Sequence, residues 1–254
     1  MSPELTVERR DGVLVMTMNR PEARNAMTQA LALEMANALD RLNEEPDLRV
    51  GVLTGAGGTF CSGMDLKAFL RGELPRVEGR GFGGLTQRPP LKPLIAAVEG
   101  YALAGGFEMV LACDLIVASR DAKFGLPEVK RGLAATAGGL IRLPRRISYH
   151  IAMQHILTGD MLSAERAAQL GLVNELTAPG EALAGALSLA SKLLANGPLA
   201  IAASKRVAME SRDWREDEMF ERQAAYTAPV FDSEDAKEGA RAFGEKRTPK
   251  WKGL

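Results

Sequence analysis

The chain has 254 residues, 46% hydrophobic and 25% charged, and its 32 basic side chains are balanced by 32 acidic ones. This length suits one large domain, or one domain with an appendage. Zero formal net charge provides no field of one sign to attract nucleic acid or anionic lipid, so we expect neither as a partner. The longest apolar run, residues 101–118, is interrupted by Gly105, Gly106, Glu108 and Asp114, which excludes a membrane-spanning helix.

The two cysteines, Cys61 and Cys113, are far apart in the sequence and lack the spacing of metal ligands, so we expect no metal site. The N-terminus shows no signal-peptide pattern. Together these features predict a cytoplasmic protein. His150 and His155 are five residues apart, too far around a helix to act as a pair, and we interpret them as packing or surface residues.

The first half of the sequence predicts strands that alternate with helices. Asp11-Gly12 is a strong turn dipeptide between two apolar runs, and Thr28 can cap a helix whose leucines and methionine repeat at helical spacing. This alternation indicates an α/β core. The expected strands are 5–9, 13–18, 50–53, 94–98 and 114–118, and the expected helices are 28–43, a short one from Asp65, and 105–112.

After residue 138 the sequence becomes mainly helical, except for a strand-like segment at 173–176. Asn196-Gly197-Pro198 is a clear break between two of the helices. We therefore expect a core over 1–196 and a helical C-terminal region over 197–254. The expected helices are 148–158, 163–170, 181–195, 198–211, 215–225 and 233–246.

Residues 71–93 differ from the rest of the chain. They contain five glycines and four prolines and show almost no apolar periodicity. A structureless loop of this length is either a lid or binding loop, or a disordered excursion. Both readings stay open; under the first, residues 71–90 become ordered when a ligand binds.

Two glycine-rich turns, Gly63-Met64-Asp65 and Ala104-Gly105-Gly106, each follow a strand and open a helix. The first amides of a helix have no intrahelical acceptor and carry the positive end of the helix dipole. If the two turns meet in space, their N–H groups can point at one developing oxyanion. Either turn alone is more often a device for tight packing. The run 54–63 lacks the ending of a P-loop, so nucleotide phosphate is not its target.

Several motifs in a fixed order resemble the crotonase (enoyl-CoA hydratase/isomerase) superfamily, which acts on acyl-CoA thioesters. They are NRPEARNAM, VLTGAGGTFCSGMDLK, KPLIAAVEGYALAGGFE, ACDLIVAS, FGLPEVKRGL and EDAKEGARAFGEKR. The resemblance implies an α/β spiral of ββα units, with a C-terminal helical region that assembles a homotrimer or a hexamer built as a dimer of trimers. It also implies that the backbone N–H groups of Met64 and Gly105 form the oxyanion hole.

Two glutamates complete the expected chemistry. Glu108 follows Gly105 by about one helical turn and sits among apolar residues, where an exposed face is hard to find. Hydration of a 2-enoyl thioester needs a base for water and an acid for the α-carbon. Similarity to hydratases, which carry glutamates at both matching positions, implies that Glu108 activates water and Glu128 transfers a proton at the α-carbon. Which glutamate is acid and which is base stays open.

The sequence departs from the family pattern at two places. Ala104 stands where hydratases commonly have a glycine, although Gly105 is kept. Residues 132–139 read GLAATAGG, so that Ala135 and Thr136 replace a proline and a glycine of the usual pattern. The second departure changes the shape of the pocket and leaves the substrate open.

The resemblance also implies where coenzyme A binds. Phe243 and Lys246 match a C-terminal motif that reaches the CoA, often across a subunit boundary. Coenzyme A is part of the substrate, and we expect no other cofactor. The remaining matched positions are Ala23, Arg24, Ala26, Ser62, Asp65, Leu66 and Lys67.

The leading interpretation is a 2-enoyl-CoA hydratase. The alternatives, in order, are a crotonobetainyl/carnitinyl-CoA hydratase-dehydratase, an enoyl-CoA isomerase and a non-catalytic acyl-CoA-binding protein. The retained glutamates argue against the last. The C-terminal segment from Glu234 resembles the carnitinyl subgroup as much as general hydratases.

Overall fold

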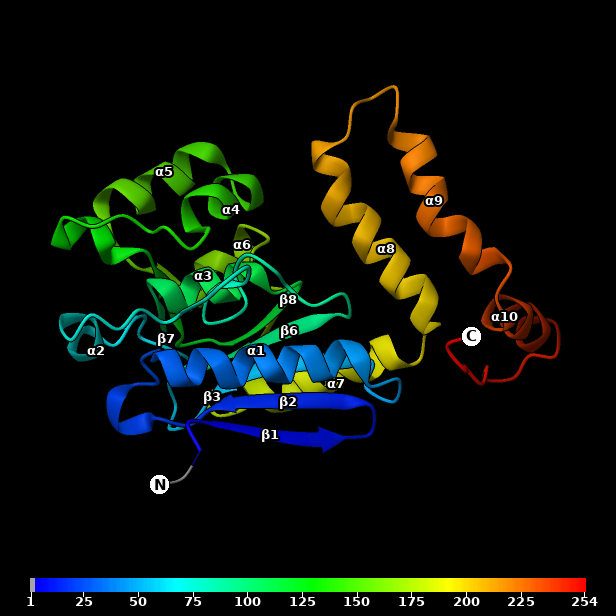
Figure 1. Ribbon diagram of the computed structural model, residues 1–254, viewed down its shortest axis with the longest axis horizontal. Helices are drawn as coiled ribbons and strands as arrows, with labels where there is room; N and C mark the ends of the chain where they lie inside the picture. The colour runs from blue at the N-terminus through cyan, green and yellow to red at the C-terminus, as the bar shows by residue number, and fades with distance from the viewer. Residues whose placement is uncertain (1–2) are drawn as a thin grey trace.

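A computed structural model describes residues 3–254 and centres on a six-stranded sheet (Figure 1). Its first two strands are antiparallel, and every later neighbour pairs in parallel. The strands, in spatial order, are β1 (Leu5–Arg10), β2 (Val13–Met18), β3 (Val50–Gly55), β6 (Leu94–Val98), β8 (Leu115–Ser119) and β11 (Glu175–Thr177).

The central strands of this sheet are buried on both faces, whereas five of the six residues of the edge strand β1 are exposed. Side chains of successive residues point to opposite sides of a sheet. In β2, Val13 and Val15 pack on one face, whereas Leu14 and Met16 pack on the other. Helix α7 (Ala182–Leu194) covers the first face with alanines. Helices α1 (Gln29–Glu44) and α3 (Gly105–Ala112) contribute to the larger core on the second face, and α1 and α7 lie on opposite sides of the sheet (Figure 1).

The chain also forms a second, smaller sheet of three strands. It consists of β10 (Leu162–Ser163), β9 (Lys123–Gly125) and β7 (Tyr101–Leu103). The chain passes from β6 through β7 into α3, which is a ββα unit, and β8 continues into β9 in the same way. The expected α/β architecture built from ββα units is therefore confirmed.

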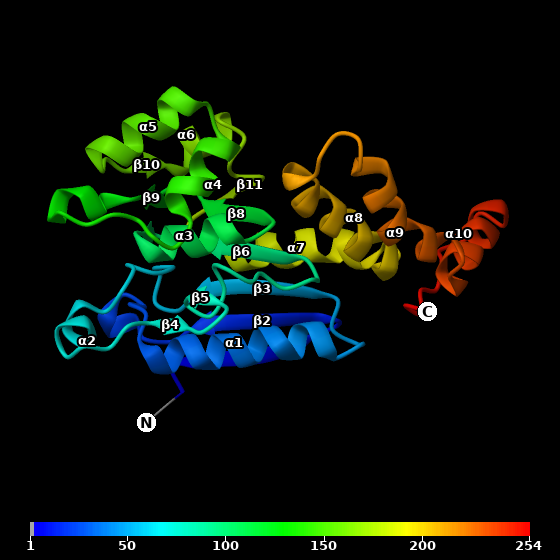
Figure 2. The ribbon, with the colours of Figure 1, turned by 45° about the horizontal axis from the view of Figure 1, so that its top comes forward.

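The remaining helices cover this core or extend from it. Helices α8 to α10 project to one side of the body that carries the sheets (Figures 1 and 2). The helices are α2 (Leu66–Leu70), α4 (Gly139–Arg146), α5 (Tyr149–Thr158), α6 (Ala164–Gln169), α8 (Pro198–Glu210), α9 (Met219–Phe231) and α10 (Glu234–Gly244), with short 3-10 turns η1 (Pro21–Ala23), η2 (Pro127–Arg131) and η3 (Ser211–Asp213).

Within residues 3–254, no single helix has the length and apolar character needed to cross a bilayer. By those two criteria alone, one sharply bent pair passes, formed by Ala182–Leu194 and Pro198–Asp213.

Most expected elements are found within a residue or two, but two helices differ. Helix α9 spans Met219–Phe231 instead of 215–225, and it continues through Pro229. Helix α4 was not expected, because its sequence contains Pro144 and a run of arginines. Its buried Leu143 and its packing against α3 stabilise it in spite of the proline.

The expectation of a structureless segment at 71–93 is wrong. The segment contains a two-stranded sheet, β4 (Arg76–Val77) and β5 (Gly81–Phe82), and residues 80–86 are buried. Gly84 has φ of +65°, and a Cβ built on it would lie 2.5 Å from the carbonyl oxygen of Ala32 in α1. The glycines therefore permit close packing on α1, rather than disorder.

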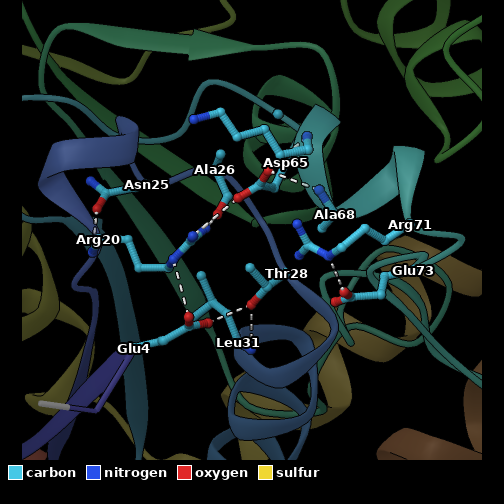
Figure 3. A network of polar contacts seen from close by, with 12 residues as sticks. Glu4, Arg20, Asn25, Ala26, Thr28, Leu31, Asp65, Ala68, Arg71 and Glu73 are labelled. Atoms are coloured by element: carbon cyan, nitrogen blue, oxygen red, sulfur yellow. Dashed lines mark hydrogen bonds and ion pairs between the residues drawn. The ribbon is translucent and has the colours of Figure 1, made fainter. Parts of the chain in front are cut away.

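A partly buried arginine, Arg20, joins the beginning of α1 to the beginning of α2. Arg20 donates from Nη2 to Oδ2 of Asp65 at 3.0 Å and pairs through Nε with Oε1 of Glu4 at 3.1 Å (Figure 3). Asp65 also caps α2, accepting from the amides of Lys67 and Ala68 at 3.0 and 3.2 Å. One guanidinium thus holds the turn that contains Met64.

Replacing this arginine is expected to destabilise the protein. Arg20→Met leaves two partly buried carboxylates without their partner, and we expect the free energy of unfolding to fall by about 1–3 kcal/mol. The matched control is Arg71→Met, which removes an exposed pair with Glu73 and should change it by less than about 0.5 kcal/mol. Urea unfolding followed by circular dichroism measures both. Equal effects of the two substitutions would show that the Arg20 network contributes nothing beyond an exposed pair.

Candidate active site

The two candidate oxyanion donors lie side by side. Cys61 forms a bridge with Ala102, in which its amide donates to the carbonyl oxygen of Tyr101 and its own carbonyl oxygen accepts from Leu103, both at 2.9 Å. This bridge aligns residues 61–64 with 102–105. A Cβ built on Gly63 would lie 3.6 Å from the amide nitrogen of Gly105.

Both donor amides are free of protein acceptors. Met27 and Met64 form an isolated parallel bridge. Its two hydrogen bonds run from the amide of Met27 to the carbonyl oxygen of Gly63 and from the amide of Asp65 to that of Met27, so the amide of Met64 takes no part in them. Gly105 is the first residue of α3. Among residues 3–254, neither the Met64 nor the Gly105 amide has a hydrogen-bond acceptor. Two backbone donors beside a helix N-terminus are suited to binding an oxyanion.

Glycine is required at the start of α3 for steric reasons. A Cβ on Gly106 would lie 2.3 Å from the carbonyl oxygen of Cys61, and one on Gly105 would lie 2.3 Å from Cζ of Phe82. Ala104, which replaces the usual glycine, has φ of +50° and ψ of −128°. This is a backbone conformation that L-residues rarely adopt, and such strain is often found at functional sites.

Glu108 is held by a loop that precedes α4. Glu108 is only 3% exposed, and its Oε1 accepts from the amides of Ala137 and Gly139 at 2.7 and 2.8 Å. Burial raises the pKa of Glu108, while the two amide bonds and the charges of Arg142 and Arg76 oppose that rise. Gly139 permits this approach, because a Cβ there would lie 3.1 Å from Cγ of Glu108.

Glu128 lies in the 3-10 turn η2, which ends at Gly132 in the left-handed conformation. Its Oε2 is buried and has no hydrogen-bond partner in the described part of the chain. Burial, and then the nearby charge of Glu108, raises the pKa of Glu128 to about 7. The two carboxyl groups are thus close enough to influence each other.

The arrangement separates two chemical roles. A carboxylate that accepts two amide N–H bonds is stabilised in its charged form, whereas a buried carboxyl without such bonds favours its protonated form. At neutral pH the pair can therefore act as one base and one acid, next to two free N–H donors.

Most of the other predicted site residues lie close to Met64 in the sequence or in the fold. Ala23, Arg24, Ala26 and Ser62 belong to the segments that flank Met64, and the amide of Ser62 donates to Arg24 at 3.1 Å. Leu66 and Lys67 begin α2 with exposed side chains. The carboxylate of Asp65, by contrast, is already bound by Arg20 and two amides.

Phe243 and Lys246 are not brought to this site within one chain. Phe243 lies in α10 and is 88% exposed, and Lys246 follows that helix. Helix α10 lies at the far end of the projecting region, well away from α3 (Figures 1 and 2).

Several residues of the site did not come from sequence reasoning. The amides of Ala137 and Gly139, the ring of Phe82 and the guanidinium of Arg76 all approach the α3 turn or the loop that holds Glu108. The only sequence signal for them is the paired glycine that precedes α4. Within the described residues, no group of three or more His, Cys, Asp or Glu side chains is placed to hold a metal ion.

Comparisons with known proteins agree with this geometry. The family described as enoyl-CoA hydratase/isomerase matches residues 8–254. The chain is 44% identical to enoyl-CoA hydratase EchA19 of Mycobacterium tuberculosis, covering 97% of this chain and 96% of that protein. It is 41% identical to the carnitinyl-CoA dehydratase of Salmonella arizonae, with both chains fully covered.

Solved structures similar to this chain carry the same two kinds of name, enoyl-CoA hydratase and carnitinyl-CoA hydratase. The crystal structure of enoyl-CoA hydratase EchA1 from Mycobacterium marinum is 61% identical, with a TM-score of 0.98 and full coverage of both chains. That of carnitinyl-CoA hydratase from Mycobacterium avium is 42% identical, with a TM-score of 0.81 and full coverage of both. With its two ββα turns, its paired glutamates and a family match over nearly its whole length, this chain belongs to the enoyl-CoA hydratase/isomerase family of enzymes.

Proposed function

We propose that the protein is an enoyl-CoA hydratase, which adds water across the 2,3 double bond of a 2-enoyl-CoA to give a 3-hydroxyacyl-CoA. The observation that carries this proposal is a pair of carboxyl groups in unlike environments beside two free amides. Glu108 is buried and accepts two amide bonds, whereas Glu128 is half-buried with an unpaired, buried Oε2. Hydration needs an acid and a base at once, and this pair supplies both.

The amides of Met64 and Gly105 bind the thioester oxygen, where negative charge develops in the transition state. Glu108 accepts a proton from water as the water oxygen bonds to C3. The electron pair of the double bond moves toward C2 and the thioester oxygen. Glu128 then donates its proton to C2, so that water has been added as hydrogen at C2 and hydroxyl at C3. Removing one such oxyanion donor typically slows a reaction by about 100- to 1000-fold.

Two alternatives belong to the same family. A carnitinyl-CoA dehydratase carries out the same addition or elimination of water, and two relatives of this chain bear carnitinyl-CoA names. An isomerase moves a proton between two carbons and requires no second carboxyl group for water. The second buried glutamate therefore favours hydration over isomerisation, and over binding without turnover.

Coenzyme A, as part of the substrate, is the only cofactor that this chemistry requires. The flanking positions of Met64, including Arg24 and Lys67, are the proposed contacts to its nucleotide arm, and the cytoplasm is the proposed compartment. Asp65 contributes to this binding by fixing the start of α2, because its carboxylate is already engaged.

Replacing either glutamate tests the proposal. We expect Glu108→Gln and Glu128→Gln each to reduce crotonyl-CoA hydration by at least about 1000-fold, while acyl-CoA affinity stays within about tenfold. Glutamine keeps the volume of the side chain but cannot exchange the proton. Loss of the enoyl absorbance measures turnover, and a thermal melt checks folding. Glu165→Gln, at an exposed position of α6, is the control and should keep full activity. Full activity in either folded site variant refutes the assignment.

The pH dependence tests the division of roles. The pKa of Glu128 is raised to about 7, so its proton is present below that pH and is lost above it. We expect kcat/KM for hydration to fall as pH rises through about 7, and to fall on the acid side as Glu108 becomes protonated. A profile that stays flat between pH 6 and 9 would contradict the assignment of Glu128 as the acid.

The projecting C-terminal region supports assembly as a homotrimer, or as a dimer of trimers. No residue of α8 or α9 is buried within the chain, and Phe220 and Phe231 are 77% and 79% exposed. Apolar surface of this kind is typical of an interface. We propose that residues 197–254 form the assembly region and that Phe243 and Lys246 reach the site of a neighbouring subunit.

Light scattering at micromolar concentration should give the mass of three or six chains. Phe231→Glu places a charge on the exposed surface of α9, and we expect it to shift the distribution toward smaller species. A wild-type protein that is monomeric at this concentration would contradict the proposal.

A further inference from the structure

One departure from the family pattern has a partner in the structure. Thr136, in the loop that holds Glu108, is exposed, and its Oγ1 accepts from Nη2 of Arg76 at 2.9 Å. The next residue, Ala137, donates its amide to Glu108 at 2.7 Å. The guanidinium of Arg76 is thus one residue away from the group that fixes the proposed base.

Arg76 is placed there by its backbone, so its position does not depend on the threonine alone. It begins β4, and Gln29 in α1 clamps it through two bonds. Nε2 of Gln29 donates to the carbonyl oxygen of Arg76 at 3.0 Å, and the amide of Arg76 donates to Oε1 of Gln29 at 3.3 Å. The strand that pairs with β4 contains Phe82, whose ring lies against Gly105.

The direction of the acyl chain follows from the proposed function, on which this inference rests. The thioester oxygen lies at Met64 and Gly105, and C3 must lie within reach of Glu108. Atoms beyond C3 therefore continue past Glu108, toward the loop of residues 135–139 and the strand that contacts it. In this orientation, Arg76 and Thr136 are the polar pair that a substituent on C4 would approach.

The charges on this side of the site are positive. Arg76 and Arg142 are the two arginines whose charges act on Glu108. Arg142 donates to the carbonyl oxygen of Thr86 and, at 3.5 Å, to that of Ala137, so it lies on the other side of the same loop. Of the two glutamates used in the proposed reaction, Glu108 is ionised and Glu128 is protonated in the hydration-competent form.

We propose that Arg76 is a specificity-determining residue, which disfavours 2-enoyl-CoA substrates with a cationic group on C4 and admits uncharged acyl chains. The site would then distinguish an uncharged 2-enoyl-CoA from a carnitinyl-type substrate by charge rather than by size. The fully covered relatives with carnitinyl-CoA names make this the distinction that matters for the substrate of this chain.

Two substrates of the same shape isolate the charge. Crotonobetainyl-CoA carries a trimethylammonium group on C4, and 5,5-dimethylhex-2-enoyl-CoA carries a tert-butyl group at the same place. The readout is the ratio of kcat/KM for the uncharged substrate to that for the cationic one. Unit charges several ångströms apart near a protein surface change such a ratio by about tenfold or more. We expect wild-type enzyme to favour the uncharged substrate by at least about tenfold.

Substitutions at Arg76 should move this ratio. We expect Arg76→Gln to lower it several-fold and Arg76→Glu to lower it by at least about tenfold. Arg88→Glu makes the same charge change at an exposed position twelve residues later, and should leave the ratio within about twofold. Turnover of the uncharged substrate by each variant shows that it has folded.

The outcomes separate this inference from the proposed function. If wild-type enzyme fails to hydrate crotonyl-CoA, the proposed function itself is wrong. If it hydrates crotonyl-CoA but shows no preference for the uncharged substrate, the inference is wrong and the function stands. A merely structural role for Arg76 would lower kcat/KM for both substrates equally, and an unchanged ratio in Arg76→Glu overturns the inference in the same way.

Discussion

The close approach of residues 61–63 to the first turn of α3 is the contact on which the site depends. Cys61 pairs with the strand that enters α3, and its carbonyl oxygen occupies the space that a side chain on Gly106 would need. Any larger residue at that position would separate the two turns. The amides of Met64 and Gly105 would then lie further apart, and the proposed oxyanion hole would be lost.

Packing then gives two chemically identical side chains different properties. Glu108 is buried and Glu128 is half-buried, and this burial raises the pKa of each. Only Glu108 receives two backbone N–H bonds, and those bonds come from a loop 29 and 31 residues further along the chain. The glycine at position 139 is what allows the loop to come so close. The proposed base and acid therefore differ in the path of the backbone around them, not in residue type.

Local patterns predicted the large sheet, α1, α3 and the two donor turns, because apolar periodicity and turn glycines act over a few residues. The remaining features, which are helix α4, the loop that binds Glu108 and the packing of residues 71–93, depend on contacts between residues far apart in the sequence. Helix α4 forms in spite of Pro144 because it packs on α3, and the amides that bind Glu108 have no side-chain signature. The residues 71–93 show no periodicity, since glycines at 83 and 84 pack by their backbones. The proposed contact of Phe243 with a neighbouring subunit has no counterpart within one chain, where this side chain is exposed.

The proposed substrate selectivity is assigned to residues 71–93, the segment with the least periodicity in the sequence. In the proposed reaction the donor turns and glutamates act on the thioester and the double bond, which every 2-enoyl-CoA has, so they cannot distinguish one acyl chain from another. The strands β4 and β5 bring Arg76 and Phe82 to the far side of the site. Phe82 packs against Gly105, and Arg76 bonds Thr136, which itself departs from the family pattern. This side of the site can therefore differ between relatives while the proposed oxyanion donors and acid-base pair stay in place.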